Sequence, residues 1–454
     1  MIGKEASTEN INEIKKKVIS LYLNDGYFQP SIEVKKDSQF PNIYQAIVVE
    51  PILLGFEVKG GNSDIRSKAV NFLNSLLGGS IVNEKTFTYL ENALESRLGV
   101  GINIEHSLLD QQNQGFNIVV KIVGSINSTL SVSNEGTNRL GREIISAEVQ
   151  LVEQVSGFKS VYISTFNTLK TDGYRSIGAG FNSGVSKNNE LIFDLNISRG
   201  RYENLFDKTV PDVVYDRRFM KLGWQFQPSE SNSFSNAVFL NIISNDLERE
   251  QYTTDFEEKL RSVEVGYWQQ NVWQGNTLYW QITGEQGLDS LGAKLEGPLA
   301  DSNVEIDYSL FRARLAFNQN LPWDIGVRTD LQGQYTEDFL PFTQRYTIAN
   351  DSLVRAFESG EINGDSGIAA KIEISKGEDL ALLSSRFVPY GYYSLGKVRD
   401  NINTESITAA SVGLGIRWFN RHVFSFVELG KPLEEDSIYR TDSPRIRAAV
   451  RLYF

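Results

Sequence analysis

The sequence predicts a small α+β region followed by an all-β region, a 16-stranded antiparallel transmembrane β-barrel. Three observations support this fold class. Helical periodicity is confined to about the first 125 residues, short alternating segments then continue to the C-terminus, and their connections alternate between short and long. The mean hydropathy of -0.28 fits such a barrel, because its strands alternate apolar with polar residues. No run approaches the roughly 20 apolar residues of a membrane-spanning helix.

Composition narrows the possible functions. Lys and Arg total 45 against 57 Asp and Glu, a net charge of -12, whereas a nucleic-acid partner requires a basic surface. The absence of cysteine excludes disulfides, thiolate metal sites and cysteine nucleophiles. Only two histidines are present, His106 and His422, which argues against a histidine metal site or acid–base site. The sequence therefore predicts no nucleic-acid partner, no metal and no cofactor.

The N-terminal region predicts one complete α+β domain preceded by part of another. In residues 52–124 the pattern runs strand, helix, helix, strand, strand, which suits a compact α+β domain. Residues 1–51 have the pattern of the last half of a second copy. The segment Met1 to Glu5 lacks the charged start and apolar core of a signal peptide. The predicted elements are helix 10–23, strands 31–34, 43–49 and 53–59, helices 65–76 and 83–98, and strands 102–108 and 116–123.

Residues 125–454 predict sixteen strands, with about 20 residues for each strand and its connection. One face of each strand is apolar and the other is polar, as where Ile446, Ala448 and Val450 alternate with arginines. Six arginines on the polar faces are expected to line the lumen: Arg312, Arg314, Arg328, Arg445, Arg447 and Arg451. The strands are expected to start near Ile126, Glu143, Ser160, Tyr174, Glu190, Arg217, Ser233, Lys259, Asn276, Glu305, Trp323, Asp365, Ser385, Ser406, His422 and Arg445.

The connections between these strands also alternate in length. Bacterial outer-membrane barrels have short periplasmic turns and long outer loops. A soluble β-sandwich also alternates and stays as an alternative, although sandwiches usually have about seven to nine strands and less systematic charge on one face. The aromatic fraction of 11% suits interfacial girdles and core packing equally. Short connections at 157–159, 187–189, 321–322 and 420–421 interleave with long ones at 204–216, 246–258, 288–304 and 338–364.

No catalytic constellation is found in the sequence. Gly364-Asp365-Ser366-Gly367 has the form of a serine-protease nucleophile turn, but His106 lies in the helical region and His422 at a tight turn. Gly178-Ala179-Gly180, followed by Gly184, has the wrong spacing for a dinucleotide loop and lies in a strand-like segment. Glycine there is expected to relieve crowding or to bend the sheet. The sequence predicts no catalytic residue and no enzyme.

Several segments resemble one transporter family. Val48 to Gly61 looks like the joint between two POTRA domains, and the order strand, helix, helix, strand, strand is that of a POTRA domain. Leu130 to Arg142 resembles the opening hairpin of two-partner secretion transporters of the haemolysin and filamentous-haemagglutinin type. Between the eleventh and twelfth strands, Val354-Arg355-Ala356-Phe357, followed by Gly364 and Asp365, is similar to the family signature Val-Arg-Gly-Phe/Tyr. Segments 412–418 and 431–433 and the terminal Phe454 also resemble these transporters.

The resemblance implies a fold and a function. POTRA domains in the periplasm would capture an unfolded, β-rich exoprotein, and the barrel in the outer membrane of a Gram-negative-type bacterium would conduct it outward. The sixth outer loop would fold back into the lumen, where Arg355 would pair with an acidic residue on the barrel wall. Phe454 would be an assembly signal for the barrel assembly machinery, and outer-membrane lipid would surround the barrel. The chain would then lack its signal peptide and the front of its first POTRA domain.

Two positions depart from the family pattern. Ala356 replaces the motif glycine, and its methyl group would disfavour φ > 0 at the loop tip. In the wall motif Tyr-Tyr-Ser-Leu-Gly, Ser394 stands where the family has its acid. Arg355 is therefore expected to use another acid that faces the lumen, Glu373 or Asp330.

These observations predict an outer-membrane secretion pore, with residues 1–51 a partial first POTRA domain, 52–124 the second, and 125–454 the barrel. Three alternatives stay open. A barrel assembly factor of the same superfamily inserts other barrels through the seam between its first and last strands, and more POTRA copies would favour it. A diffusion porin is disfavoured by the α+β region. A soluble multi-strand binding protein would be excluded by heat-modifiable gel migration from membrane fractions.

Overall fold

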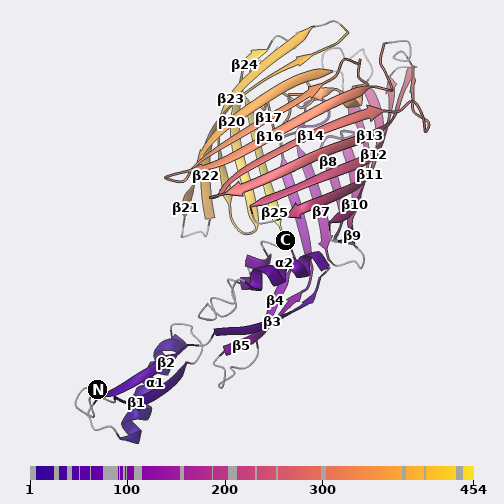
Figure 1. Cartoon of the computed structure of the whole chain (residues 1–454). Coiled ribbons are helices and arrows are strands. Elements are labelled where there is room, and N and C mark those ends of the chain that lie inside the picture. Colours follow the sequence, from indigo (N-terminus) through magenta and orange to yellow (C-terminus); the bar gives the residue numbers. More distant parts are fainter. Residues whose placement is uncertain are drawn as a thin grey trace. The chain divides into compact units, whose positions relative to one another are not determined.

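The computed structural model divides the chain into two units, residues 1–126 with 151–159, and residues 127–150 with 160–454. Each unit contains its own buried apolar cluster. The structure (Figure 1) describes residues 7–24, 30–37, 43–50, 52–61, 63–74, 90–91, 93–95, 98, 100–106, 115–153, 158–186, 188–202, 212–230, 233–251, 254–297, 303–380, 385–402, 405–435 and 443–454.

The N-terminal segment contains a helix and a hairpin. Helix α1 (Thr8–Asn24) follows Ser7, whose hydroxyl accepts a hydrogen bond from Asn10 N at 3.2 Å and so caps an amide of the first turn. Strand β1 (Ser31–Lys36) pairs antiparallel with β2 (Tyr44–Val49). These are the helix and the two strands that the sequence predicts here. None of the described helices combines the length and the apolar character of a membrane span.

The next segment forms a three-stranded sheet that packs with a helix. Strand β3 (Ile52–Gly60), helix α2 (Ser63–Asn74), β4 (Ile102–His106) and β5 (Gly115–Ile122) follow in chain order. The sheet order is β3-β5-β4, with β3 parallel to β5 and β4 antiparallel to it. Most of the predicted second helix, 83–98, lies outside the described residues. The buried core includes Leu53, Ala69, Leu73, Leu90, Leu94, Ile118 and Val120.

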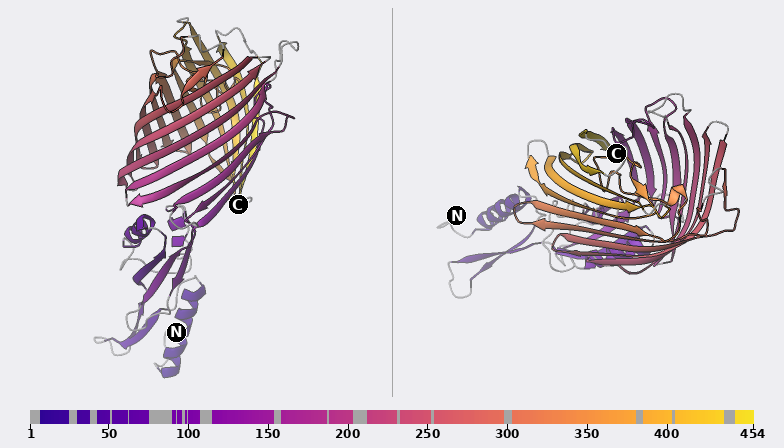
Figure 2. Two further views of the ribbon diagram at one scale, coloured as in Figure 1. Left: turned by 90° about the vertical axis from the view of Figure 1, so that its right-hand side faces the viewer. Right: turned by 90° about the horizontal axis from the view of Figure 1, so that it is seen from above.

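The predicted sixteen-stranded antiparallel barrel is confirmed. Its strands pair in chain order around a barrel (Figures 1 and 2). The barrel closes where β25 pairs with β6. Two three-residue strands, β15 (Lys294–Glu296) and β21 (Glu378–Leu380), add short pairings to β13 and β22. The long strands are β6 (Ser125–Ser133), β7 (Ile144–Val152), β8 (Ser160–Thr168), β9 (Arg175–Ser186), β10 (Asn189–Tyr202), β11 (Val213–Glu230), β12 (Phe234–Gln251), β13 (Thr254–Trp273), β14 (Asn276–Gly287), β16 (Ser309–Leu321), β17 (Ile325–Tyr335), β20 (Ser366–Lys376), β22 (Ser385–Arg399), β23 (Ser406–Phe419), β24 (Val423–Glu435) and β25 (Arg445–Tyr453).

The outer surface of the barrel is apolar. Alternate side chains of each strand point outward, and large apolar residues at these positions are exposed, such as Ile177, Leu240, Ile368 and Val450. A soluble monomer does not expose apolar area on this scale. Aromatic pairs on the same face suit the girdle of a membrane interface. These pairs are Trp224 with Phe226, Tyr267 with Trp280, Trp273 with Phe317, and Phe387 with Trp418.

Two predicted loop boundaries were wrong. The predicted long connection at 246–258 is mostly strand, because β12 and β13 stay paired across it. Strand β11 likewise starts at Val213 rather than near Arg217. Strands β11 to β13 have 18 to 20 residues, whereas about 9–11 span a bilayer. A strand that rises beyond the bilayer no longer needs an apolar outer face, so charged residues such as Asp246 and Lys259 resemble a loop in the sequence.

The core of the α+β domain makes a testable prediction. Leu73 is fully buried there, so Leu73→Ala is expected to lower the unfolding free energy of the domain by about 2–5 kcal/mol, through lost burial and a residual cavity. Hydrogen exchange of the β5 amides would measure this change. The exposed Val123 supplies the control variant Val123→Ala. Equal protection of β5 in both variants would contradict this core assignment.

Candidate functional site

The loop between β17 and β20, residues 336–365, folds onto the inner wall of the barrel; we call it the lumen loop. It contains a short 3-10 helix, η1 (Phe342–Gln344), and a two-residue ladder between β18 (Tyr346–Thr347) and β19 (Asn363–Gly364). Its apolar residues form one buried cluster with Ala369 of β20, Val398 of β22 and Ala409 of β23. The loop residues of this cluster are Ile348, Ala349, Leu353, Val354, Phe357 and Ile362.

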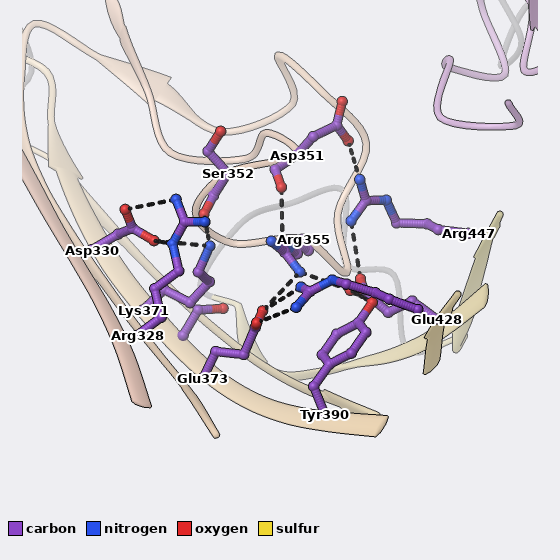
Figure 3. Close-up of polar contacts among 12 residues, drawn as sticks. Arg328, Asp330, Asp351, Ser352, Arg355, Lys371, Glu373, Tyr390, Glu428 and Arg447 are labelled. Atoms are coloured by element: carbon purple, nitrogen blue, oxygen red, sulfur yellow. Dashed lines mark hydrogen bonds and ion pairs between the residues drawn. The ribbon is translucent and has the colours of Figure 1, made fainter. Parts of the chain in front are cut away.

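Arg355 joins the lumen loop to the barrel wall (Figure 3). Its Nη1 lies 2.8 Å from Glu428 Oε2 on β24 and 3.5 Å from Glu373 Oε2 on β20. Its Nε donates a hydrogen bond to the carbonyl of Asp351 at 2.8 Å, which fixes the guanidinium within its own loop. The guanidinium also lies 5.3 Å from the ring centroid of Tyr392, within the range of a cation–π contact. One side chain thus contacts three strands of the wall.

Glu428 is a fully buried carboxylate with several partners. It accepts a hydrogen bond from the Tyr390 hydroxyl at 2.8 Å, and it lies 3.0 Å from Arg447 Nη1 as well as near Arg355. The register places Tyr390, Gly415, Glu428 and Arg447 in one row across β22 to β25. A Cβ at residue 415 would lie 2.5 Å from the Tyr390 hydroxyl, so glycine there lets the tyrosine reach across to Glu428. A buried charge needs such partners to offset its desolvation.

Of the predicted partners of Arg355, Glu373 lies close to it and Ser394 does not. Glu373 also accepts two hydrogen bonds from the Arg417 guanidinium, at 2.6 and 2.8 Å, a bidentate geometry. Ser394 is fully buried and shares a hydrogen bond of 2.8 Å with Ser411 on the next strand. The serine that replaces the family's acid is therefore satisfied by another serine.

Asp330, the remaining predicted partner, holds other cations. Its carboxylate lies 3.2 Å from Lys371 Nζ and 3.0 Å from Arg328 Nε. Lys371 in turn donates a hydrogen bond to the Ser352 carbonyl at 2.7 Å. Asp330 therefore contributes to the lumen loop indirectly, through a buried lysine that binds the loop backbone.

The sequence interpretation missed Glu428, the acid nearest to Arg355. The alternation Val427, Glu428, Leu429 already placed this carboxylate on the polar face of its strand. The family pattern pointed instead to the strand that carries Ser394. Arg355 and Glu428 are separated by 73 residues, so only the closed barrel brings them together.

Ala356 fits its position without strain. It is buried and is not among the described residues with φ > 0, so the backbone conformation that would require glycine does not occur there. The glycine at this contact belongs to the barrel wall, at Gly430 of β24. A Cβ at residue 430 would lie 3.5 Å from Ala356 Cβ, which shows how closely the loop tip approaches β24 at Gly430.

Asp365, at the end of the lumen loop, accepts a hydrogen bond from the start of the same loop. The buried carboxylate accepts hydrogen bonds from Leu340 N at 3.1 Å and from Asn401 N at 2.8 Å. Ser366 donates a hydrogen bond to the Thr336 carbonyl at 3.0 Å. Gly364 approaches the wall closely, since a Cβ there would lie 2.8 Å from the Arg399 carbonyl oxygen. The Gly-Asp-Ser-Gly segment therefore makes structural contacts.

A second buried acid, Glu258 on β13, binds the first part of the lumen loop. Its carboxylate accepts hydrogen bonds from Phe342 N at 2.9 Å and from Thr343 N at 3.2 Å, at the start of η1. The Arg249 guanidinium lies 5.0 Å from the Phe342 ring centroid. The extension of β12 and β13 supplies both residues. The sequence interpretation missed this contact, because it placed residues 246–258 in a loop.

The six predicted lumen arginines have different surroundings. Arg447 contacts Glu428 as described and lies 2.9 Å from Asp351 of the lumen loop, and Arg328 contacts Asp330. The others contact acids, carbonyls or rings of the interior. Arg312 lies 2.5 Å from Glu285, Arg445 donates to the carbonyls of Phe357 and Gly136, and Arg314 and Arg451 lie 5.8 and 5.9 Å from the ring centroids of Tyr279 and Phe424.

The site consists of paired charges and a packed loop. Arg355, Arg417 and Arg447 each contact a buried carboxylate, so the cluster holds the lumen loop against β20 to β25. In the part of the chain that the structure describes, no group of three or more Asp, Glu or His residues could hold a metal ion.

Loss of Glu428 is expected to loosen the loop tip. Glu428→Gln leaves Arg355 and Arg447 without their shared buried counter-charge, a change that typically costs about 3–5 kcal/mol. The chain has no cysteine, so Ala356→Cys provides a single buried thiol as reporter. Its maleimide labelling is expected to rise at least about tenfold with Glu428→Gln. The control is Glu296→Gln, which removes an exposed carboxylate. Equal labelling in the two backgrounds would contradict the role of Glu428.

The chain is similar to known secretion proteins along most of its length. Residues 117–418 match the family described as haemolysin secretion/activation protein ShlB/FhaC/HecB. The heme/hemopexin transporter protein HuxB of Haemophilus influenzae (strain 86-028NP) is 21% identical over 486 residues, which cover 96% of this chain and 79% of HuxB.

Solved structures show the same fold. CdiB from Escherichia coli superposes with a TM-score of 0.68 at 13% identity, over 99% of this chain and 85% of CdiB. BamA from Haemophilus ducreyi, in a form lacking POTRA domains 1-3, gives a TM-score of 0.54 at 13% identity, over 100% of this chain and 95% of BamA. The family match covers more than half of the chain. The protein belongs to the haemolysin secretion/activation family, whose members are outer-membrane transporters of two-partner secretion and not enzymes.

Proposed function

We propose that this barrel conducts an unfolded, β-rich exoprotein, the partner in its two-partner system, through its lumen to the cell surface. The observation that carries the proposal is the contrast between the two faces of the closed sheet, apolar outside and polar or charged inside. A polar interior suits the passage of a hydrated, extended chain, because it offers little hydrophobic surface to retain it. The six lumen arginines belong to this interior, where they neutralise carboxylates or line the path.

The N-terminal segments are proposed to be the capture region. Residues 1–51 would be the second half of a first POTRA domain and residues 52–124 a second POTRA domain, both on the periplasmic side. In the sheet order β3-β5-β4, strand β4 pairs with β5 alone among the described strands of that sheet. An extended client could add a strand at this edge by displacing the Glu95 and Glu91 carboxylates, which accept hydrogen bonds from Ile102 N at 3.1 Å and Ile104 N at 2.9 Å. Backbone hydrogen bonds would then supply affinity without a strict sequence requirement.

The Val354–Phe357 motif is proposed to fix the lumen loop inside the pore. Val354 and Phe357 are buried in the apolar cluster, and Arg355 reaches Glu428 and Glu373. The role of Phe454 is proposed to be that of an assembly signal. It directly follows β25 and is 72% exposed, so the barrel assembly machinery could bind it while lipid covers the finished outer surface.

Deletion of residues 1–124 tests the capture region. Secretion of the long exported protein that we expect to be encoded beside this chain's gene should fall to background, because the barrel would no longer recognise its client. Heat-modifiable gel migration would show that the barrel still folds. Undiminished secretion by the truncated barrel would refute the capture role.

A specific feature keeps barrel assembly as a second candidate function. The seam between β25 and β6 contains five residue pairs, from Ala449↔Ser133 to Tyr453↔Thr129, whereas β12 pairs with β13 along its whole length. A short seam favours lateral opening, which an assembly factor requires and a secretion pore does not.

A disulfide across the seam separates these two functions. Val132 and Val450 are directly paired, and Cα atoms of such pairs are about 4.5–5.5 Å apart, within the range that a disulfide bridges. The Val132→Cys/Val450→Cys variant is expected to secrete the client equally well oxidised and reduced, because the lumen route does not cross the seam. Secretion that stops on oxidation and returns on reduction would favour lateral release.

A further inference from the structure

We propose that the lumen loop stays seated during export, as a fixed partition of the pore, and that the exported chain passes it along the inner face of β6 to β10. We call this inner face the neutral wall. The inference rests on the proposed function, to which it adds a route and the chemistry of the surface that the client meets.

The packing of the lumen loop is that of a core. Six of its apolar side chains are buried to 1% exposure or less, against Ala369, Val398 and Ala409 of the wall. Displacing the loop would return all of this apolar surface to water. It would also leave Glu428 and Lys371 buried without Arg355 and the Ser352 carbonyl. Both costs oppose a loop that leaves the lumen for each passing chain.

The loop also divides the inner surface into a covered and an open part. Side chains of the covered wall are nearly inaccessible, with Lys371 at 2%, Glu373 at 4% and Glu428 at 1% exposure. On the neutral wall, the inward Ser164 and Asn196 are only half-buried, whereas Thr168 and Ser198, toward one end of the same wall, are buried. Their orientation follows from alternation, because the neighbouring Ile163 and Ile197 are exposed on the outer face.

The neutral wall differs from the covered wall in charge. At the inward positions of β6 to β10, the charged residues are three carboxylates, Glu148, Glu190 and Asp194, with no lysine or arginine at these positions. Cations contact this wall from its surroundings: Lys221 of β11 lies 2.6 Å from Asp194, and the Arg139 guanidinium lies 4.7 Å from the Tyr202 ring centroid. The other inward side chains are mostly serine, threonine, asparagine and glycine. Hydroxyl and amide groups can exchange hydrogen bonds with the backbone of a moving chain, whereas a row of arginines would hold its acidic residues.

Gly178 and Gly180, the glycines noted in the sequence, leave space for side chains of the neighbouring strand to lie flat on this wall. A Cβ at residue 180 would lie 2.6 Å from the Tyr162 ring, and one at residue 178 would lie 2.7 Å from Ser164 Oγ. Both side chains therefore lie flat over glycines of the next strand. The Tyr162 hydroxyl is held there by a hydrogen bond of 2.8 Å to Asp194. The wall presents an aromatic face and small polar groups and no projecting side chain at these positions. The fitting partner is an extended, unfolded polypeptide of low net negative charge.

Two cysteine pairs can lock the loop in the complete protein. A Cβ at residue 430 would lie 3.5 Å from Ala356 Cβ, and one at residue 396 would lie 3.3 Å from Ile348 Cβ, at or just below the roughly 3.5–4.5 Å of disulfide-bonded residues. The substitution at residue 430 also shifts the Tyr392 hydroxyl, 2.6 Å from that Cβ, so each variant is compared with its own reduced form. The variants are Ala356→Cys/Gly430→Cys and Ile348→Cys/Gly396→Cys in this cysteine-free chain. The probe is the exported protein encoded beside the gene, measured in the medium with and without reductant. Heat-modifiable migration verifies that each barrel folds.

Secretion through both locked variants is expected to stay within about twofold of the reduced value, because locking a loop that already occupies its export-competent position shifts no equilibrium. Secretion that stops on oxidation and recovers on reduction in both variants would overturn the fixed partition. Absence of secretion in the reduced and unsubstituted chains alike would instead refute the proposed function.

The route is tested by a bulky maleimide on single cysteines. Modification of Ser164→Cys or Asn196→Cys is expected to lower secretion at least about tenfold. The matched inward control is Gln332→Cys on β17, also half-buried, and the outward control is Ile163→Cys. Both controls are expected to secrete normally. Normal secretion after modification at Ser164 and Asn196, or a block at Gln332 alone, would overturn the neutral wall as the route.

Discussion

The interior of this barrel is organised around one buried carboxylate, that of Glu428. A charge at this depth is stable only if counter-charges and hydrogen bonds replace the water it has lost. Arg355, Arg447 and the Tyr390 hydroxyl supply these contacts from a loop and two strands. The same requirement explains Gly415, whose missing side chain leaves the space through which Tyr390 reaches the carboxylate.

The rest of the inner wall follows from this arrangement. Because Arg355 is bound to β24, the lumen loop lies against β20 to β23 and buries its apolar residues there. Further charges then pair beside it, Glu373 with Arg417 and Asp330 with Lys371. Strands β12 and β13 rise beyond the length a bilayer needs and bind the first part of the loop through Glu258. The loop is thus bound at its tip and near its start.

This arrangement leaves a barrel with two chemically different inner surfaces. The covered wall consists of paired charges under the lumen loop. The neutral wall consists mostly of small polar side chains and is not covered by the loop. A transporter of unfolded protein benefits from both. The ionic part keeps the loop in one place, and the polar part offers weak, exchangeable hydrogen bonds to a chain whose backbone groups need partners at every step.

The sequence determined the barrel and most of its strand boundaries by itself. Apolar and polar residues alternate with a period of two within each strand. This pattern is local and can be recognised without knowing which strand the segment pairs with. The starts predicted at Asn276, Ser385, Ser406 and Arg445 are the starts of β14, β22, β23 and β25. The resemblance of short motifs located Arg355 in the right loop. The family comparison then confirmed the class of transporter.

Only the tertiary structure decided which charges meet. Arg355 and Glu428 lie 73 residues apart, and their contact depends on the closure of the barrel and on the way the loop folds into it. Of the partners that the sequence predicted for Arg355, Glu373 lies 3.5 Å away, whereas Asp330 contacts Arg328 and Lys371 and Ser394 bonds Ser411. An alternating pattern shows which face a residue occupies but not its height or its neighbour across the lumen. The charged extension of β12 and β13 was predicted to be a loop for a related reason. A strand that leaves the membrane loses its apolar face, and only its pairing shows that it remains a strand.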